Sequence, residues 1–150
     1  MIRIVCVGKI KEQYLKDAIS EYTKRLSKYT KLEIIELPDY DGDKISILKK
    51  EGELILKNIK EKSYVITLEI DGLEITSEEF SKKIDNILIT NPDITFIIGG
   101  SYGLSDEVKA LSNYKLSFSK MTFPHQLFRV ILLEQIYRSF KILNNETYHK

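Results

Sequence analysis

The residues of this chain best suited to chemistry stand together in Tyr148-His149-Lys150. A tyrosine ring can stack on a flat base, and a lysine can bind a phosphate. An imidazole, whose ordinary pKa is about 6.5, can accept a proton near neutral pH. Terminal residues are often frayed, so the alternative is that His149 is a bystander. We take His149 and Tyr148 as catalytic candidates and Lys150 as a substrate-binding candidate.

Three loop segments with distinctive side chains lie at the carboxyl ends of predicted strands. They are Leu68–Gly72, Gly99–Gly103 and Phe118–Phe123. In open parallel sheets, ligands bind at the carboxyl ends of the strands. The glycines of the second loop allow a ligand to approach the main chain closely. A tight turn without any ligand is the alternative for this motif taken alone.

The chemistry of these loops disfavours a phosphate-bearing ligand. The chain has neither the Gly-x-Gly-x-x-Gly spacing of a dinucleotide site nor a P-loop. Asp106 and Glu107 begin the helix after the glycine loop and would repel a phosphate there. Hydroxyls and apolar side chains alternate over residues 118–123, a combination that suits a flat heterocycle. We therefore expect a cofactor without phosphate or with a cationic centre, although this loop could equally just cap the next helix.

The segment from Leu127 to Leu143 is apolar almost all round its helix. Such a helix needs more cover than one face of a sheet supplies, so we expect a homodimer. Full burial within one subunit is the alternative. We expect a charge at Ile136 to give monomers or aggregates.

Three further side chains near this helix are substrate-binding candidates. Arg129 and Arg138 could contact RNA or pair with Glu134, and for Arg138 the pair is favoured because the two residues are four apart. His125 opens the helix beside the third loop, where a structural cap and a site residue are equally reasonable.

Strand and helix patterns alternate along the chain. Predicted strands are Ile2–Val7, Leu32–Leu37, Tyr64–Ile70, Ile94–Ile98 and Lys115–Ser117; predicted helices are Glu12–Ser27, Ile45–Ile59, one from Thr76 to Asn91, a short one after Ser105 and the long one opened by Pro124. Asp71-Gly72 is expected to end the third strand as a turn, and Ile45 to lie on the buried face of its helix. The pattern predicts an α/β fold, a mostly parallel sheet flanked by helices, as one domain over residues 1–150.

Composition narrows the class of protein. Hydrophobic residues make up 43% of the chain and charged residues 30%, which is typical of a globular domain. The net charge is +1, so a nucleic-acid partner would need a local basic patch. The single cysteine, Cys6, is expected to be a buried, inert thiol in a reducing compartment. No signal peptide or membrane span is expected, which favours the cytoplasm.

The chain resembles the RlmH family over its whole length. These are small SPOUT-class methyltransferases that methylate N3 of a pseudouridine in large-subunit ribosomal RNA. The resemblance is most specific in Phe96–Ser105, Leu116–Gln126, Leu133–Arg138 and Tyr148–Lys150. Several separate motifs in order make a chance match improbable.

The resemblance implies a C-terminal trefoil knot, an exception to un-knotted topology, with S-adenosylmethionine bound among the knot loops. It implies a homodimer that acts on the assembled ribosome and its 23S rRNA, without a metal or a membrane. The cofactor-binding positions that it implies are Leu68, Gly99, Gly100, Phe118, Ser119, Lys120, Met121, Thr122 and Phe123. Two other classes stay open: a catalytically silent ribosome-associated dimer, and a small-molecule or nucleotide-binding α/β domain.

Overall fold

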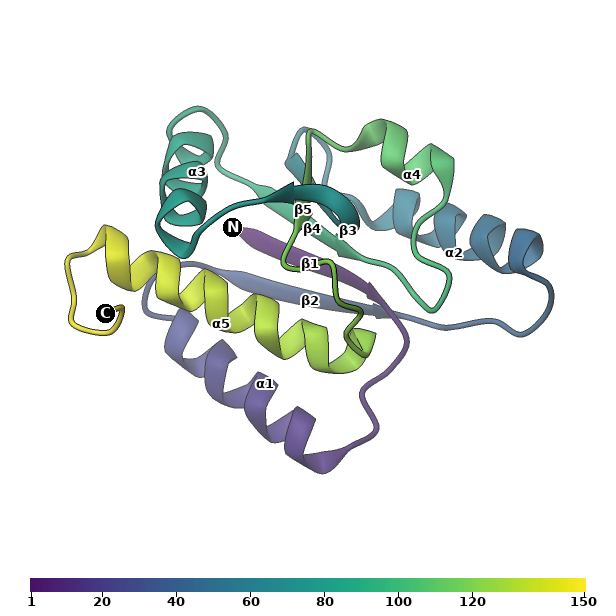
Figure 1. The fold of residues 1–150 in the computed structure, drawn as a ribbon, viewed down its shortest axis with the longest axis horizontal. Helices are drawn as coiled ribbons and strands as arrows, with labels where there is room; N and C mark the ends of the chain where they lie inside the picture. The colour runs from purple at the N-terminus through teal and green to yellow at the C-terminus, as the bar shows by residue number, and fades with distance from the viewer.

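The computed structural model describes residues 1–150 and consists of one five-stranded sheet with helices on both faces (Figure 1). In chain order the elements are β1 (Ile2–Val7), α1 (Gln13–Leu26), β2 (Leu32–Leu37), α2 (Lys44–Asn58), β3 (Tyr64–Glu74), α3 (Ser77–Thr90), β4 (Ile94–Ile98), α4 (Asp106–Leu111), β5 (Tyr114–Ser117) and α5 (His125–Leu143). The strand order is β2-β1-β4-β3-β5, and every pairing is parallel. The α/β prediction is confirmed.

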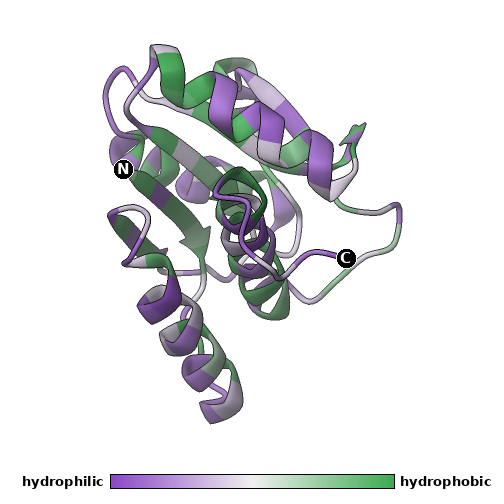
Figure 2. Ribbon diagram, turned by 90° about the vertical axis from the view of Figure 1, so that its left-hand side faces the viewer, coloured by the Kyte–Doolittle hydropathy of each residue, from purple (hydrophilic) through white to green (hydrophobic).

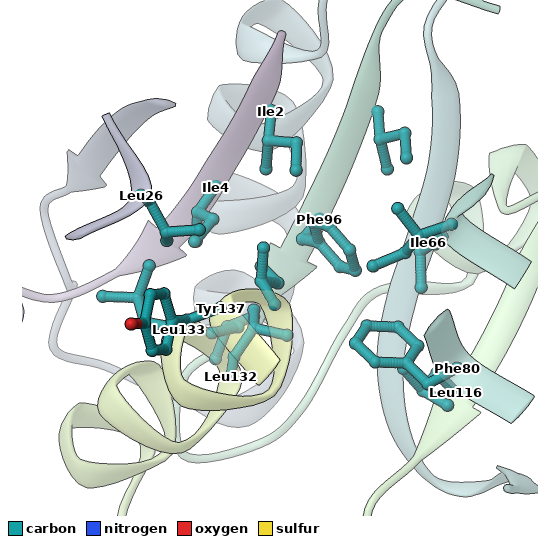
Figure 3. Packing of buried hydrophobic residues seen from close by; sticks show 14 of the residues in the cluster. Ile2, Ile4, Leu26, Ile66, Phe80, Phe96, Leu116, Leu132, Leu133 and Tyr137 are labelled. Carbon is teal, nitrogen blue, oxygen red and sulfur yellow. The ribbon is translucent and has the colours of Figure 1, made fainter. Parts of the chain in front are cut away.

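The two faces of the sheet carry separate hydrophobic cores, because successive side chains of a strand point to opposite faces. The larger core lies under α1, α3 and α5, and its cluster includes Phe96 of β4 with Leu132 and Leu133 of α5 (Figure 3). The smaller core lies under α2 and α4 and contains Val7 and Ile97. Figure 2 shows the central strands largely in the green of hydrophobic residues, whereas most helices are banded in both colours.

Helix α5 is the central helix of the larger core, packed between α1 and α3. Leu132, Leu133 and Ile136 are fully buried within the one chain. Ile136 therefore packs within its own subunit, and a charge there would disrupt that core whether or not the protein is dimeric. Side chains that remain exposed near the beginning of the helix include Leu127, at 38%.

Local signals account for most helix ends. Thr76 and Glu79 form a reciprocal capping box at the start of α3, as its sequence predicts. Asp43 accepts a hydrogen bond from the Ser46 amide and begins α2. Pro124 is the residue before α5 rather than its first helical residue, a shift of one position. Ile45 is 81% exposed, so its predicted place on the inner face of α2 is wrong; Ile47 and Ile55 lie there instead.

Strand β3 continues past the predicted turn at Asp71-Gly72 and ends at Glu74. Its pairing with β5 is interrupted between Leu68 and Leu73, both of which lie opposite Leu116. A side chain on Gly72 would come within 2.8 Å of the main chain of Lys115 and Leu116. The glycine therefore allows the extended strand to press against β5, which leaves residues 69–72 as a bulge beside the third loop.

Candidate functional site

A cavity of about 510 Å³ lies at the carboxyl ends of β3, β4 and β5. It collects all three of the loops predicted to bind a ligand. Among its lining residues are Leu68, Gly99, Gly100, Phe118, Ser119, Met121, Thr122, Phe123 and His125. Lys120 is the one predicted cofactor residue outside this lining. The parallel sheet brings these segments together because all its strands end at the same edge.

The glycine loop after β4 is held by its own main chain. A side chain on Gly99 would lie 2.5 Å from the carbonyl oxygen of Gly103, so this turn closes only with glycine at position 99. The Gly103 amide donates a hydrogen bond of 3.0 Å to the Gly100 carbonyl, and Gly103 has a φ of +79°. The loop thus presents backbone rather than side chains to the cavity.

The Cα hydrogen of Gly100 that a side chain would replace points away from the cavity, toward Val7 and Glu51. A side chain on Gly100 would lie 3.2 Å from Val7 and from both carboxylate oxygens of Glu51. The glycine therefore fits closely behind the loop, and a Cβ there would make Val7 or Glu51 move by a few tenths of an ångström. A substitution such as Gly100→Val would push the loop out of place rather than fill the cavity.

The helix after the glycine loop begins without a phosphate cradle. Ser105 caps α4 by accepting from the Val108 amide at 3.4 Å, and Asp106 and Glu107 occupy the first turn. Their carboxylates are placed to interact favourably with the helix dipole. The beginning of this helix is consequently occupied by its own carboxylates and offers no anion site.

The third loop uses its hydroxyls to fix its own shape. The Ser117 hydroxyl donates to the Ser119 carbonyl at 3.1 Å, and the Ser119 hydroxyl accepts from the Met121 amide at 3.0 Å. Phe118 and Phe123 both pack on the ring of Phe128, with centroid distances of 5.0 and 6.0 Å. An apolar wall with ordered backbone groups results, the surroundings that a flat heterocycle requires.

His125, at the beginning of α5, lines the cavity and is half-buried. Burial lowers its pKa from the ordinary value, and the nearby Arg129 cation lowers it further, against a weaker opposite effect of Asp39. His125 is therefore neutral at physiological pH. Its ring packs against Gly8, where an added side chain would lie 3.3 Å from Nε2.

Arg129 is fully buried. Its guanidinium donates to Glu36 at 2.7 Å and to the carbonyl oxygens of Val7 and Gly8 at 3.2 and 3.0 Å. It pairs with Glu36 rather than Glu134, and it offers no surface to RNA. We therefore replace the expected RNA contact by a positioning role: Arg129 ties α5 to the end of β1, one turn from His125.

The C-terminal tail lies against α3 and α5, not among the residues that line the cavity (Figure 1). The Tyr148 hydroxyl donates to Glu134 at 2.9 Å, and burial followed by this bond raises the pKa of Tyr148 to about 12. His149 Nε2 lies 2.7 Å from Glu78, and Nδ1 lies 3.1 Å from Arg138. Lys150 is exposed.

These contacts determine which nitrogen of His149 carries the proton. The carboxylate of Glu78 can only accept, so Nε2 donates to it, and the lone pair of Nδ1 accepts from Arg138. Arg138 also forms the predicted ion pair with Glu134, at 2.8 Å. Both nitrogens of His149 are therefore engaged in hydrogen bonds in this arrangement.

Sequence reasoning missed several residues of the site. Lys44 and Lys109 also line the cavity, but nothing in their local sequence distinguishes them from surface residues. Tyr102 lines it too and lies within the predicted glycine loop, although it was not among the predicted site residues. Glu51 is different, because it lies between Ile47 and Ile55 on the buried face of α2. Ile47, Glu51 and Ile55 follow one another at intervals of four residues, so an acidic residue within this apolar stripe was a signal that could have pointed to Glu51.

Comparisons with known proteins agree on one family. A family model described as "Predicted SPOUT methyltransferase" matches residues 1–149. A Methanococcus maripaludis protein, provisionally named ribosomal RNA large subunit methyltransferase H, is 61% identical over 99% of both chains. Proteins of that name from Clostridium botulinum strain Kyoto and Clostridium perfringens strain 13 are 60% and 58% identical, each over 99% of both chains.

A solved structure supports the fold alone. A probable methylase family protein from Haemophilus influenzae superposes with a TM-score of 0.58 and 18% identity, covering 99% of this chain and 70% of that one. At this identity the likeness concerns architecture and not substrate.

Proposed function

Because the chain belongs to the SPOUT methyltransferase family, we propose that it methylates N3 of a pseudouridine in large-subunit (23S) ribosomal RNA, with S-adenosylmethionine as methyl donor. The relatives named above are described as large-subunit rRNA methyltransferases. Residues 1–150 would act as one catalytic domain in the cytoplasm, on the assembled ribosome.

The observation that carries this proposal is the cavity at the ends of β3, β4 and β5. Its backbone-lined glycine loop, its phenylalanine wall and its lack of a phosphate cradle suit an adenosine group without phosphate. When bound, S-adenosylmethionine supplies an electrophilic methyl group on a sulfonium. Main-chain groups of Gly99, Gly100 and residues 118–123 would hold the cofactor, and the chain must align the target base with that methyl group.

A base must accept the proton that N3 of pseudouridine loses. We propose His149 in this role, with Tyr148 positioned to stack on the RNA and Lys150 to bind phosphate. Arg138 must first release Nδ1 of His149, since that nitrogen otherwise accepts its hydrogen bond. His125 is a second candidate, because it is neutral and already lines the cavity.

The separation of the C-terminal tail from the cavity of the same subunit favours a homodimer. The tail packs on its own subunit beside α3, so a second copy would bring its tail to the cavity of the first. Met121, Phe123 and Leu127 leave 74%, 36% and 38% of their surface exposed around the beginning of α5. We propose that this exposed apolar patch forms part of the interface.

A ligand panel tests the proposal against its alternatives. S-adenosylmethionine and S-adenosylhomocysteine should raise the melting temperature, whereas ATP and NAD should not; saturation at 100 times the dissociation constant adds about 2.7 kcal/mol. A shift with ATP alone would indicate a nucleotide-binding domain. Cofactor binding without methyl transfer to ribosomes would indicate a catalytically silent ribosome partner. His149→Gln and His125→Asn, compared in methyl transfer, identify the base.

A further inference from the structure

Glu51 is a buried carboxylate without a cationic partner. It is 4% exposed, and its Oε1 has no hydrogen-bond partner. Carboxylates are seldom buried unless they are paired, because their charge loses the stabilisation of water. Burial, followed by the negative charge of Asp39, raises the pKa of Glu51. The fold thus keeps, on the inner face of α2, a carboxylate whose burial lowers the stability of the protein.

This carboxylate lies directly behind the wall of the cavity. Both of its oxygens are 3.2 Å from the point where a side chain on Gly100 would begin, and Gly100 lines the cavity. Gly100 is thus the residue of the cavity wall against which the carboxylate lies. A larger residue at position 100 would push the carboxylate away.

The other charged residues of the lining balance one another. Lys44 and Lys109 are opposed by Glu69 and Asp71, and all four are at least partly exposed to solvent. Water and salt screen such charges, whereas a buried charge is screened much less. Glu51 is therefore positioned to act on a ligand's charge with little screening.

We propose that Glu51 makes the site selective for the cationic methyl donor over its neutral product. This inference rests on the proposed function. During transfer the bond between sulfur and methyl breaks, and its electron pair stays on sulfur as the N3–methyl bond forms. The sulfonium becomes an uncharged thioether, and the N3 proton goes to the base. The attraction to Glu51 is thereby lost, which favours release of S-adenosylhomocysteine.

Calorimetric titration of Glu51→Gln with both cofactors tests this selectivity. The variant should bind S-adenosylmethionine about tenfold more weakly, the scale of two unit charges about 12 Å apart at an effective dielectric constant of about 20. It should bind S-adenosylhomocysteine within about twofold of the parent. Equal weakening of both ligands, or of neither, would overturn the inference. If the parent protein bound neither ligand, the proposed function itself would fail.

Two companion variants exclude simpler explanations. Glu53→Gln removes an exposed charge from the same helix and should leave both affinities unchanged. Glu51→Asp keeps the charge, so the ratio of the two affinities should stay closer to that of the parent than in Glu51→Gln. The unliganded Glu51→Gln protein should be at least as stable as the parent, because an uncompensated buried charge is removed. A large loss of stability would instead assign Glu51 a structural role.

Discussion

Replacing Arg129 by methionine should destabilise the protein without removing any contact to RNA. The fully buried guanidinium bonds Glu36, Val7 and Gly8, and it joins the beginning of α5 to the end of β1. Methionine fills much of the same volume but leaves the two main-chain carbonyls without this donor. Breaking a buried pair costs about 3–5 kcal/mol.

The lower end of that range applies here, because Glu36 is 36% exposed and also accepts from the Ile10 amide at 2.8 Å. We therefore expect a loss of about 3 kcal/mol in the free energy of unfolding. For a domain of this size that is a fall in melting temperature of about 6–12 °C. Urea and thermal unfolding of parent and variant measure both quantities.

Arg138→Met is the matched control, because Arg138 is a half-buried arginine of the same helix. Its side chain is 25% exposed and bonds no main-chain carbonyl, so its loss should cost less, about 1 kcal/mol. If Arg129→Met unfolded within about 1 kcal/mol of the parent, the positioning role of Arg129 would be refuted. If Arg129→Met lost methyl transfer at unchanged stability, the sequence-based hypothesis that Arg129 contacts RNA would be supported instead.

Three other predictions concern the core, the tail and the dimer. Burial raises the pKa of Cys6 to about 11, so iodoacetamide at pH 8 should label it only in urea; rapid labelling of the native protein would contradict its placement. Hydrogen bonds, from Lys141 first, lower the pKa of Glu146 to about 2, below an ordinary value of 4.5. These bonds stabilise the folded protein fully above pH 4.5, the ordinary pKa of a glutamate, and their contribution is lost as the pH falls toward 2. Glu146→Gln should therefore lower the melting temperature at pH 7 but not at pH 2. A charge at Leu127 should give folded monomers in sedimentation, whereas one at Ile136 should unfold the subunit; a dimeric Leu127→Asp protein would place the interface elsewhere.

The strand boundaries were predictable where local signals end a buried apolar run. β1, β2 and β4 have their predicted bounds, because Gly8, Pro38 and Asn91-Pro92 interrupt the pattern. The extension of β3 was not predictable, because it depends on the close approach of Gly72 to β5. Asp71-Gly72 is an ordinary turn pair by local chemistry, and a tertiary contact overrides it.

The grouping of the three loops followed from the parallel sheet, since parallel strands end at one edge. The partners of the charged residues did not follow. Arg129 and Glu36 are 93 positions apart in the sequence, and His149 and Glu78 are 71 apart. No local spacing could have indicated either pair. Among the candidate site residues, Arg138 is the one whose partner, Glu134, is indicated by a spacing of four residues on one helix.

The central claim is methyl transfer to a pseudouridine of large-subunit rRNA, and nucleoside mass spectrometry tests it most directly. Ribosomes that lack the modification would be incubated with the protein and S-adenosylmethionine, and their 23S rRNA digested. We predict that 3-methylpseudouridine appears with the parent protein and falls about a hundredfold in rate with His149→Gln. Absence of any methylated nucleoside, or methylation of a base other than pseudouridine, would contradict the account.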